Sequence, residues 1–592
     1  MNDYCIVRTE KRRALKKRKI NYEILIIIVL SLIPKLIYSL RALPFNVLGD
    51  EIWTLAPAAK LAGLNWSGAL EGGRYYGMGF FSLFAPLFKI IDNPNMLYKI
   101  IVTILVLISV VIPLVAYYIL SKTLKVQTPL VRVFLSVAMS YFIYWPIAMV
   151  YNEHIYIVLW WVIIFLFIKL LENENNKKKK NIYTLLLILT MMYSYTIHAR
   201  ATALWVGIVI GILLYKIAYK NWVISPKVFF VVMILGYLGV QLFINKQINW
   251  LWHAPGTGSI SNSSAYSGGV HLLFDPAYWQ TIVSIGIGQV FAGNAFTGGL
   301  LIPIIILSIV FVFKGFRKKT KESVPKEIFL VSVITIITCL ITIGGQSISW
   351  SGGVKLFLEG DLAYADATRA ISYLRYYMAY VGPFFLIGIV YFVKNIEIVK
   401  KYLSQIIIVD VAILGVWLAF IYPYICYGRE NSTPYFAFSL QNIRATDAGM
   451  RTYIPAIILM VILSILCFVL INKKKFKVAV VILAIFMCYK YCYYAETIII
   501  NEAKRQETVT KIDEAIDLDN EENIPDTLYV NNDRELTDLL QYYLPKKEII
   551  NNIDNIKTDK NTIIFSKDKV KNLSLYEEKN IGKELYVYYI NE

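Results

Sequence analysis

The stretch Leu48-Gly49-Asp50-Glu51-Ile52-Trp53 places two adjacent carboxylates directly after the first long apolar run of the chain. This position predicts an outward-facing loop beside a membrane surface. An ionisable side chain at lipid depth costs roughly 2.5–3.5 kcal/mol, so residues of this kind are functional candidates by default. We therefore predict that Asp50 and Glu51 belong to an active site that faces out of the cell.

The composition around this stretch is that of a polytopic membrane protein. The 592 residues are 57% hydrophobic and only 17% charged, whereas about 25% of the residues of a soluble domain are charged. The apolar residues occur in runs of about 20, the length that crosses a hydrocarbon layer about 30 Å thick. The net charge of +19 lies mainly in short loops between these runs, so a nucleic-acid partner is not needed to explain it.

The apolar runs predict about 13 transmembrane helices within residues 20–495, preceded by a basic N-terminus at residues 1–19. The predicted helices lie near residues 20–40, 97–120, 131–150, 155–171, 182–198, 201–219, 226–244, 296–314, 327–346, 373–393, 404–423, 453–471 and 478–495. With the N-terminus in the cytoplasm, every loop that this order places inside contains lysine or arginine. This bias marks cytoplasmic loops and supports the order of crossings in a multi-pass protein of the cell membrane.

The outward-facing connections carry the polar residues, and all but a tight turn at residues 151–154 are long. They are predicted near residues 41–96, 151–154, 245–295, 347–372 and 424–452. Loops longer than about 15 residues are usually functional, so we expect the chemistry on this side of the membrane. Within the first connection, residues 77–91 are apolar but too few to cross the membrane, which predicts an interfacial or re-entrant helix.

The chain after residue 495 loses its long apolar runs, so residues 496–592 are predicted to form a soluble domain outside the cell. Strand patterns occur at residues 527–530, 562–565 and 584–590, and residues 534–544 read as a short helix. A small α/β domain fits this pattern.

The outward connections bring together charged residues of both signs. The carboxylates are Asp50, Glu51 and Glu153, with His154 beside the last, and the arginines at outer helix ends are Arg74, Arg200 and Arg375. A carboxylate can remove the proton of an acceptor hydroxyl while arginines hold an anionic lipid phosphate. Purely structural roles also fit each residue alone. An arginine at a helix end can extend to the lipid headgroups, Glu153 can stabilise a helix N-terminus through the helix dipole, and His154 can be a polar residue of the membrane interface.

Three short motifs give this arrangement a family resemblance. They are Gly49-Asp50-Glu51-Ile52-Trp53 with Ala58-Ala59-Lys60-Leu61, then Gly77-Met78-Gly79-Phe80-Phe81-Ser82, and Leu374-Arg375-Tyr376-Tyr377 with Pro383 following. With the order of spans, they resemble the GT-C superfamily of membrane glycosyltransferases. The chain is most similar to the family of protein O-mannosyltransferases and lipid A aminoarabinose transferases. It departs from that family at residues 77–82, where relatives often carry a Lys-Pro-Pro-Leu-like segment.

The resemblance covers about the first 495 residues and implies transfer of a sugar from a polyprenyl phosphate donor. The acceptor is a glycan, lipid or protein of the cell envelope. By the resemblance, Asp50 is the general base or orients the acceptor, Glu51 supports it, and Glu153 is the second acidic position. Arg375, with Arg200 and Arg74, holds the donor phosphate, and His154 and Tyr376 contact substrate. Some members use a divalent cation and others do not, so Mg²⁺ or Mn²⁺ at Asp50 and Glu153 stays open.

Two other functions compete with this interpretation. A transporter or flippase of a lipid-linked sugar would place ionisable residues deep in the spans and break helices at mid-membrane; among acidic residues, Asp410 is the main one within a predicted span. A polysaccharide polymerase or ligase would use arginines on a large outer loop, and residues 245–295 contain none.

Overall fold

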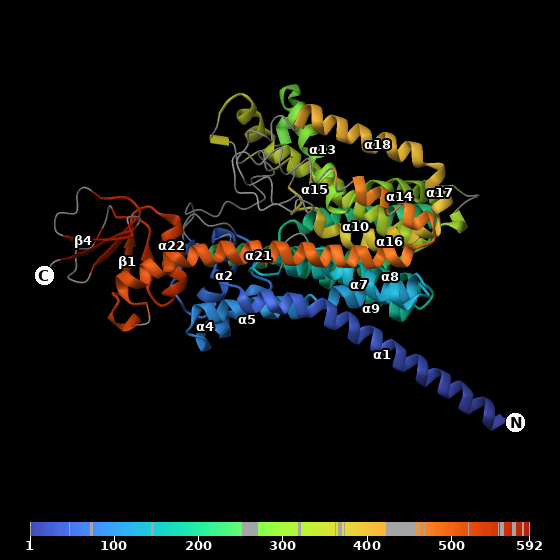
Figure 1. The fold of residues 1–592 in the computed structure, drawn as a ribbon, viewed down its shortest axis with the longest axis horizontal. Helices are drawn as coiled ribbons and strands as arrows, with labels where there is room; N and C mark the ends of the chain where they lie inside the picture. Colours follow the sequence, from blue (N-terminus) through green and yellow to red (C-terminus); the bar gives the residue numbers. More distant parts are fainter. Residues whose placement is uncertain are drawn as a thin grey trace.

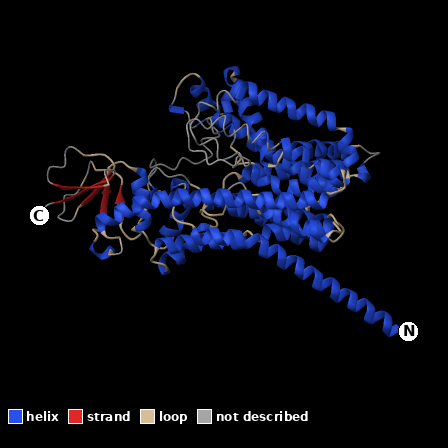
Figure 2. Cartoon of the chain, in the orientation of Figure 1, coloured by secondary structure: helices blue, strands red, loops and turns tan. Residues whose placement is uncertain are grey.

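A computed structural model gives the fold of the chain (Figure 1). It describes all residues except 1, 47, 71–74, 144–146, 252–269, 318–320, 362, 365–366, 368–369, 372, 422–457, 459–460, 467, 519, 554–555, 557–561, 571–575, 583–584 and 591–592. Helices dominate, and strands occur at one end of the molecule only, next to the C-terminus (Figure 2).

Seven helical segments in the described part of the chain are long and apolar enough to cross a membrane. They are Tyr22–Arg41 in α1 (Asn2–Arg41), Pro94–Thr123, which joins α5 (Pro94–Ile108), α6 (Val111–Tyr118) and η2 (Ile119–Thr123), then α8 (Asn152–Glu172), α10 (Ala201–Tyr219), α11 (Pro226–Leu251), α15 (Lys326–Leu358) and α21 (Phe476–Ile516). An eighth span is counted if Pro276–Phe296 and α14 (Leu301–Phe316), bent by 105°, cross together. The protein is therefore a multi-pass membrane protein.

The predicted number of 13 spans is not confirmed. The other apolar helices are shorter than a full crossing, namely α7 (Pro129–Ser140), α16 (Met378–Lys394), Leu403–Ala419, which contains α18 (Leu403–Val416), and Val461–Asn472. Helix α9 (Lys177–Ile197) has the length of a span but begins with four lysines. The helix predicted at 453–471 lies largely outside the described residues.

The lysine-rich connections between helices lie together at one end of the bundle, opposite the C-terminal sheet (Figure 1). Lys394 donates to the carbonyl of Leu124 at 2.9 Å, and Lys326 pairs with Glu174 at 2.5 Å. These contacts join four turns that the sequence places on the same side of the membrane, including those before α9 and α15 and after α16. These four turns therefore lie at one end, as the order of spans predicts, and the assignment of this end to the cytoplasm remains a prediction.

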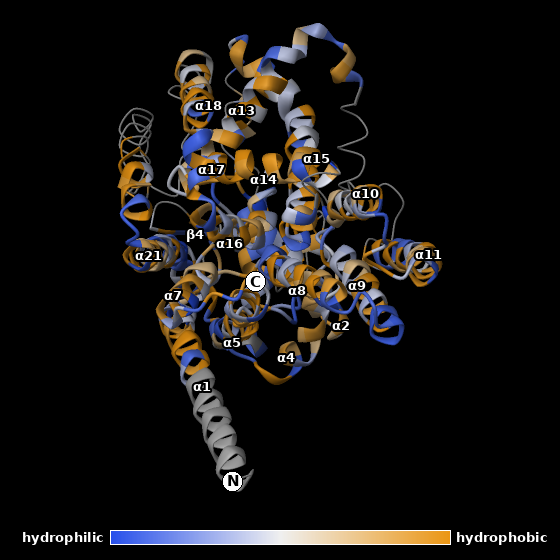
Figure 3. Cartoon of the chain, turned by 90° about the vertical axis from the view of Figure 1, so that its right-hand side faces the viewer, coloured by the Kyte–Doolittle hydropathy of each residue, from blue (hydrophilic) through white to orange (hydrophobic). Residues whose placement is uncertain are grey.

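The outermost helices are rich in hydrophobic residues (Figure 3), and several of their apolar side chains are exposed, as on a lipid-facing surface. On α11, Leu235 and Leu242 are each 65% exposed, and Ile234 is 60% exposed. Only 11% of the most apolar stretch of this helix is buried inside the protein. Without a bilayer such a surface would be unfavourable.

The first outward connection is helical where a loop was expected. Its elements are α2 (Leu48–Leu61), α3 (Ser67–Leu70), η1 (Phe81–Phe84) and α4 (Ala85–Ile90). Asp50 and Glu51 occupy the first turn of α2, where the helix dipole favours negative charge. The short apolar helix Phe81–Ile90 agrees with the prediction for residues 77–91.

The loop predicted at residues 245–295 is wrong for most of its described residues. Helix α11 continues to Leu251, and after η3 (Val270–Phe274) and η4 (Pro276–Tyr278), helix α13 (Trp279–Phe296) follows. Its glycines suggest a loop, but they serve packing: a Cβ on Gly288 would lie 2.3 Å from the carbonyl oxygen of Ile371. Likewise, α15 extends to Leu358 into the connection predicted at 347–372, whereas the connection at 424–452 lies outside the described residues.

The remaining short elements of the membrane part are η5 (Lys321–Ser323), α17 (Ile396–Lys401) and η7 (Trp417–Ile421). Helix α21 then runs unbroken from the bundle into the exterior domain (Figure 1), so the boundary predicted at residue 496 falls inside a helix. The exterior domain contains η9 (Glu521–Asn523), β1 (Thr527–Val530), α22 (Arg534–Tyr543), β2 (Glu548–Ile550), β3 (Ile563–Ser566), β4 (Tyr576–Ile581) and β5 (Leu585–Ile590).

The five strands form one mixed sheet in the order β2-β1-β3-β5-β4. Strand β1 is parallel to β2 and β3, whereas β5 is antiparallel to β3 and β4. The α/β prediction is confirmed for β1, α22, β3 and β5. Strands β2 and β4 were not predicted, because one has only three residues and the other, Tyr576-Glu577-Glu578-Lys579-Asn580-Ile581, shows no apolar alternation.

Candidate active site

Helix α2 points its two acidic side chains in different directions. Asp50 faces a polar cluster, in which its Oδ2 accepts from Nη1 of Arg375 at 2.7 Å and its Oδ1 accepts from the hydroxyl of Tyr76 at 2.6 Å. Its side chain is 17% exposed. Asp50 is thus bound to the Arg375 guanidinium and can still be reached from outside the cluster.

Glu51 is fully buried and holds backbone instead. Its Oε1 accepts from the amide of Asn46 at 2.8 Å, and its Oε2 accepts from the amide of Val150 at 2.9 Å and from the hydroxyl of Tyr98. These contacts tie the start of α2 to α5 and to the segment before α8. The geometry gives Glu51 a positioning role, in line with the supporting role that the resemblance implies.

Arg375 lies at the centre of the polar cluster, in the turn before α16. Its Nε donates to Oε1 of Glu153 at 2.7 Å while its Nη1 binds Asp50. Glu153, in the first turn of α8, also pairs with Nη2 of Arg200 at 3.0 Å. The side chains of Arg375, Glu153 and Arg200 are 7%, 6% and 11% exposed. Two carboxylates and two guanidinium groups from four segments therefore form one nearly buried cluster with no net charge.

The glycines of the second motif bring Tyr76 to this cluster. Gly77 has φ +94°, and a Cβ there would lie 2.3 Å from the carbonyl oxygen of Ile197. The amide of Gly79 donates to the carbonyl of Thr196 at 3.0 Å. The chain at 76–79 can thus run against the end of α9, where the Tyr76 ring meets His198 edge-on with centroids 6.3 Å apart.

Three polar atoms of this site are buried without a hydrogen-bond partner among the described residues: Nη2 of Arg375, Oε2 of Glu153 and Nε2 of His198. Nδ1 of His198 accepts from the amide of Arg200 at 3.1 Å, so the proton of the neutral ring belongs on Nε2. Burial and the neighbouring Arg200 lower the pKa of His198 well below its usual value. Because buried polar atoms are almost always paired with protein or ordered water, these two donors and one acceptor are available to a ligand or to water.

The other predicted site residues differ in their placement. The ring of Tyr376 lies under the guanidinium of Arg200, 3.6 Å from its centroid. His154 is buried against Tyr151, with ring centroids 6.3 Å apart, and neither of its ring nitrogens has a hydrogen-bond partner among the described residues. Arg74 lies outside the described residues. The sequence reasoning missed Tyr76 and His198, although the neighbouring Gly77-Met78-Gly79 and Arg200 were signals for both.

The structure was also tested for a metal site. No group of three or more His, Cys, Asp or Glu side chains in the described ranges is arranged to hold a metal ion. Asp50 and Glu153 each pair with Arg375, whose positive charge already lies between them. A divalent cation at these two carboxylates would have to compete with Arg375 and stays a prediction.

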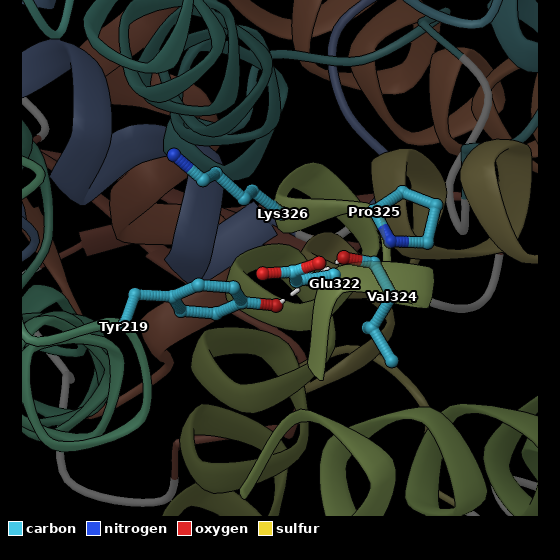
Figure 4. Close-up of a pocket in the computed structure, with 5 residues that line it drawn as sticks. All are labelled: Tyr219, Glu322, Val324, Pro325 and Lys326. Carbon is cyan, nitrogen blue, oxygen red and sulfur yellow. Dashed lines mark hydrogen bonds between the residues drawn. The ribbon is translucent and has the colours of Figure 1, made fainter. Parts of the chain in front are cut away.

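A hollow of about 480 Å³ lies far from this site, at the lysine-rich end of the bundle (Figure 4). Tyr219, Glu322, Val324, Pro325 and Lys326 line it. None of the predicted site residues reaches it, so it is not part of the candidate active site.

Comparisons with known proteins bear on the fold. No protein-family model and no curated protein sequence matches the chain. Among solved structures, ArnT from Cupriavidus metallidurans bound to undecaprenyl phosphate is similar with a TM-score of 0.50 and 11% identity, over 95% of this chain and 97% of that one. The apo state of the same protein gives a TM-score of 0.49 with 10% identity, over 97% and 98%. The fold is thus ArnT-like over nearly the whole length, which confirms the expected resemblance and extends it to the exterior domain.

Proposed function

We propose that the protein is a GT-C-type glycosyltransferase that moves a sugar from a polyprenyl phosphate carrier to an acceptor outside the membrane. The observation that carries this proposal is Arg375, which joins Asp50 to Glu153 and keeps Nη2 buried without a partner in the described structure. A planar guanidinium with a free donor suits a phosphate oxygen. The similar fold of ArnT, whose structure holds undecaprenyl phosphate, supports a ligand of this class.

In the proposed reaction, Asp50 is the general base. The hydroxyl oxygen of the acceptor attacks the anomeric carbon of the sugar while its proton passes to the Asp50 carboxylate. The bond between the anomeric carbon and the phosphate oxygen breaks, and polyprenyl phosphate leaves with the bonding electrons. Arg375 and Arg200 stabilise the negative charge that builds on the leaving phosphate.

The other groups of the site fit the sugar and the phosphate. Oε2 of Glu153 can accept a hydrogen bond from a sugar hydroxyl, and Nε2 of His198 can donate one. Tyr376 keeps the guanidinium of Arg200 in place by stacking beneath it.

The proposed orientation places the N-terminus in the cytoplasm and the exterior domain outside the cell. The lysine-rich turns then face the cytoplasm, as the positive-inside rule requires. The cluster of Asp50, Glu153, Arg200 and Arg375 lies at the opposite ends of its helices, beside the exterior domain. Acceptors of the cell envelope reach it from that side.

A transporter or flippase of a lipid-linked sugar is a second candidate, because two lysines lie buried in the helical bundle. Lys35 is fully buried and donates to Ser109 at 3.1 Å and Ser140 at 2.8 Å. Lys490 is 5% exposed, and its ammonium lies over the Phe296 ring, 3.2 Å from the centroid. Ionisable groups at such depth occur along transport pathways, so the experiment must separate transfer from transport.

The test uses the purified protein in lipid nanodiscs with a panel of polyprenyl-phosphate sugars and a cell-envelope extract, whose glycans, lipids and proteins supply the acceptor hydroxyl. Mass spectrometry follows the release of free polyprenyl phosphate by the wild type and by Asp50→Asn, which keeps the size of the side chain. The matched control is Asp92→Asn, an exposed carboxylate on the same side of the protein. We expect release by the wild type and the control and none by Asp50→Asn. Full release by Asp50→Asn contradicts its role, and movement of intact donor across proteoliposomes without release favours transport.

A further inference from the structure

Arg534 connects the exterior domain to the segment that carries the candidate base. It begins α22, and its guanidinium donates to the carbonyl of Gly68 at 2.9 Å and to that of Ala69, both in α3. Asp538, which is 1% exposed, holds the same guanidinium at 2.8 Å. A Cβ on Gly68 would lie 1.9 Å from the carbonyl oxygen of Ile549 in β2, so the two parts of the chain are in close contact here.

Trp53 carries this contact into α2. The guanidinium of Arg534 lies over its ring at 5.8 Å from the centroid. The indole Nε1 donates to the carbonyl of Ala69 at 3.2 Å, the same carbonyl that Arg534 binds. Trp53 is therefore held from above by the exterior domain and at its edge by α3.

The chain of contacts ends at Asp50. The ring of Trp53 stacks on that of Tyr76, with centroids 6.1 Å apart and planes 19° apart. The hydroxyl of Tyr76 in turn donates to Oδ1 of Asp50 at 2.6 Å. Stacked rings restrict each other's rotation, so the position of Trp53 decides where this hydroxyl points.

We propose that Arg534 of the exterior domain is a positioning residue for the transfer reaction, acting through Trp53 and Tyr76 on the orientation of Asp50. This inference rests on the proposed function. Because Trp53 and Tyr76 lie between Arg534 and Asp50 in this chain of contacts, the effect of Arg534 on Asp50 is indirect. The contact of Arg534 with Trp53 thereby supports the orientation of the proposed base from the exterior domain.

The domain has other contacts that keep it docked without Arg534. Arg505, in the exterior part of α21, donates to the carbonyls of Phe45 at 2.9 Å and Asn46 at 3.0 Å. Tyr542 donates to the carbonyl of Pro94 at 2.9 Å and packs on Phe45, with ring centroids 4.6 Å apart. Loss of Arg534 should therefore free Trp53 while the domain stays in place.

A double-mutant cycle tests the proposal, with the release of polyprenyl phosphate as the readout. The variants are Arg534→Met, Tyr76→Phe and both together. Residues that act through one chain of contacts give non-additive effects. We expect each single change to lower kcat about tenfold, or about 1.4 kcal/mol, with KM for the donor unchanged. The double variant should lose about tenfold as well, not a hundredfold.

The controls separate positioning from folding. Lys569→Met removes an exposed ion pair with Glu578 at the far side of the same domain and should keep full activity. Arg534→Lys keeps the charge beside Asp538 and should recover part of kcat; it replaces Arg534→Met in the cycle if the latter does not fold. Multiplicative losses in the cycle, or full activity without Arg534, overturn the proposal. Absence of release by the wild type instead overturns the proposed function.

Discussion

Replacing Arg375 by methionine tests the charge balance of the site most directly. In the wild type, Asp50 and Glu153 contribute two negative charges and Arg200 and Arg375 two positive ones. Arg375→Met leaves one uncompensated negative charge in a place where the Arg375 and Glu153 side chains are only 7% and 6% exposed. Burial of an unpaired charge is far more costly than the absence of both partners.

The magnitude follows from the contacts that remain. Removal of one partner of a buried ion pair costs about 3–5 kcal/mol. Glu153 keeps Arg200 at 3.0 Å, and Asp50 keeps the Tyr76 hydroxyl and 17% exposure, so we expect the lower end, about 3 kcal/mol. Adding Glu153→Gln restores a neutral cluster and should recover most of this loss. Activity should not return, because loss of one donor to a developing oxyanion costs about 10²–10³ in kcat.

Two measurements on the same samples decide the matter. The midpoint of thermal inactivation at a fixed scan rate reports stability, since membrane proteins of this size seldom unfold reversibly. Release of polyprenyl phosphate reports activity. If Arg375→Met alone were as stable as the wild type, the argument from charge balance would be refuted. If the Arg375→Met/Glu153→Gln double variant were active, the phosphate-binding role proposed for Arg375 would be refuted.

Two further outcomes follow from neighbouring carboxylates. Glu51→Gln replaces a carboxylate oxygen that accepts from buried amides by an NH2 donor, so it should lower the inactivation midpoint by an amount that corresponds to about 1–3 kcal/mol. Asp50→Asn also unbalances the charge of the cluster, but its side chain is 17% exposed and the amide oxygen can still accept from Arg375, so the midpoint should fall less than for Glu51→Gln. An equally large fall for Asp50→Asn would contradict the different burial of the two side chains. Burial raises the pKa of Asp538 from its ordinary 3.8 to about 7, so the folded domain binds a proton between about pH 4 and 7 that the unfolded chain releases. The free energy of unfolding should therefore fall as pH rises through that window, by up to about 4 kcal/mol. The inactivation midpoint of Asp538→Asn should depend less on pH than that of the wild type. If the midpoints of both proteins changed in parallel with pH, Asp538 would not be the cause of the pH dependence.

The sequence predicts best what the membrane dictates. A hydrocarbon layer requires apolar runs and lysine-rich turns in alternation, and the turns before α9 and α15 and after α16 do meet at one end. The same alternation places Asp50, Glu153, Arg200 and Arg375 on one side, and the structure brings all four together. Their placement on one side required only knowledge of which side each helix end faces, whereas the ion pairs among them were not predicted.

Local conformation set the limit of these predictions. Asp50 and Glu51 were expected to act together in a loop, but successive residues of a helix point about 100° apart. Helix α2 therefore directs Asp50 to the cluster and Glu51 to the amides of Asn46 and Val150. Tyr76 could not be found among 43 tyrosines because its place depends on Gly77, whose φ of +94° lets the chain approach α9.

The neutral cluster also links the two halves of the proposed reaction. A donor phosphodiester carries one negative charge, and the phosphate monoester that leaves carries about −1.5 to −2. When Asp50 takes the proton of the acceptor, its own charge disappears and the cluster becomes positive by one unit. Before the reaction, Arg375 Nη1 donates to the Asp50 carboxylate at 2.7 Å. In the proposed reaction, protonation of Asp50 weakens this ion pair while the leaving phosphate gains negative charge, so the guanidinium can bind the phosphate instead. Proton transfer and phosphate departure thus stabilise each other through a single guanidinium, which accounts for a base and a phosphate ligand in direct contact.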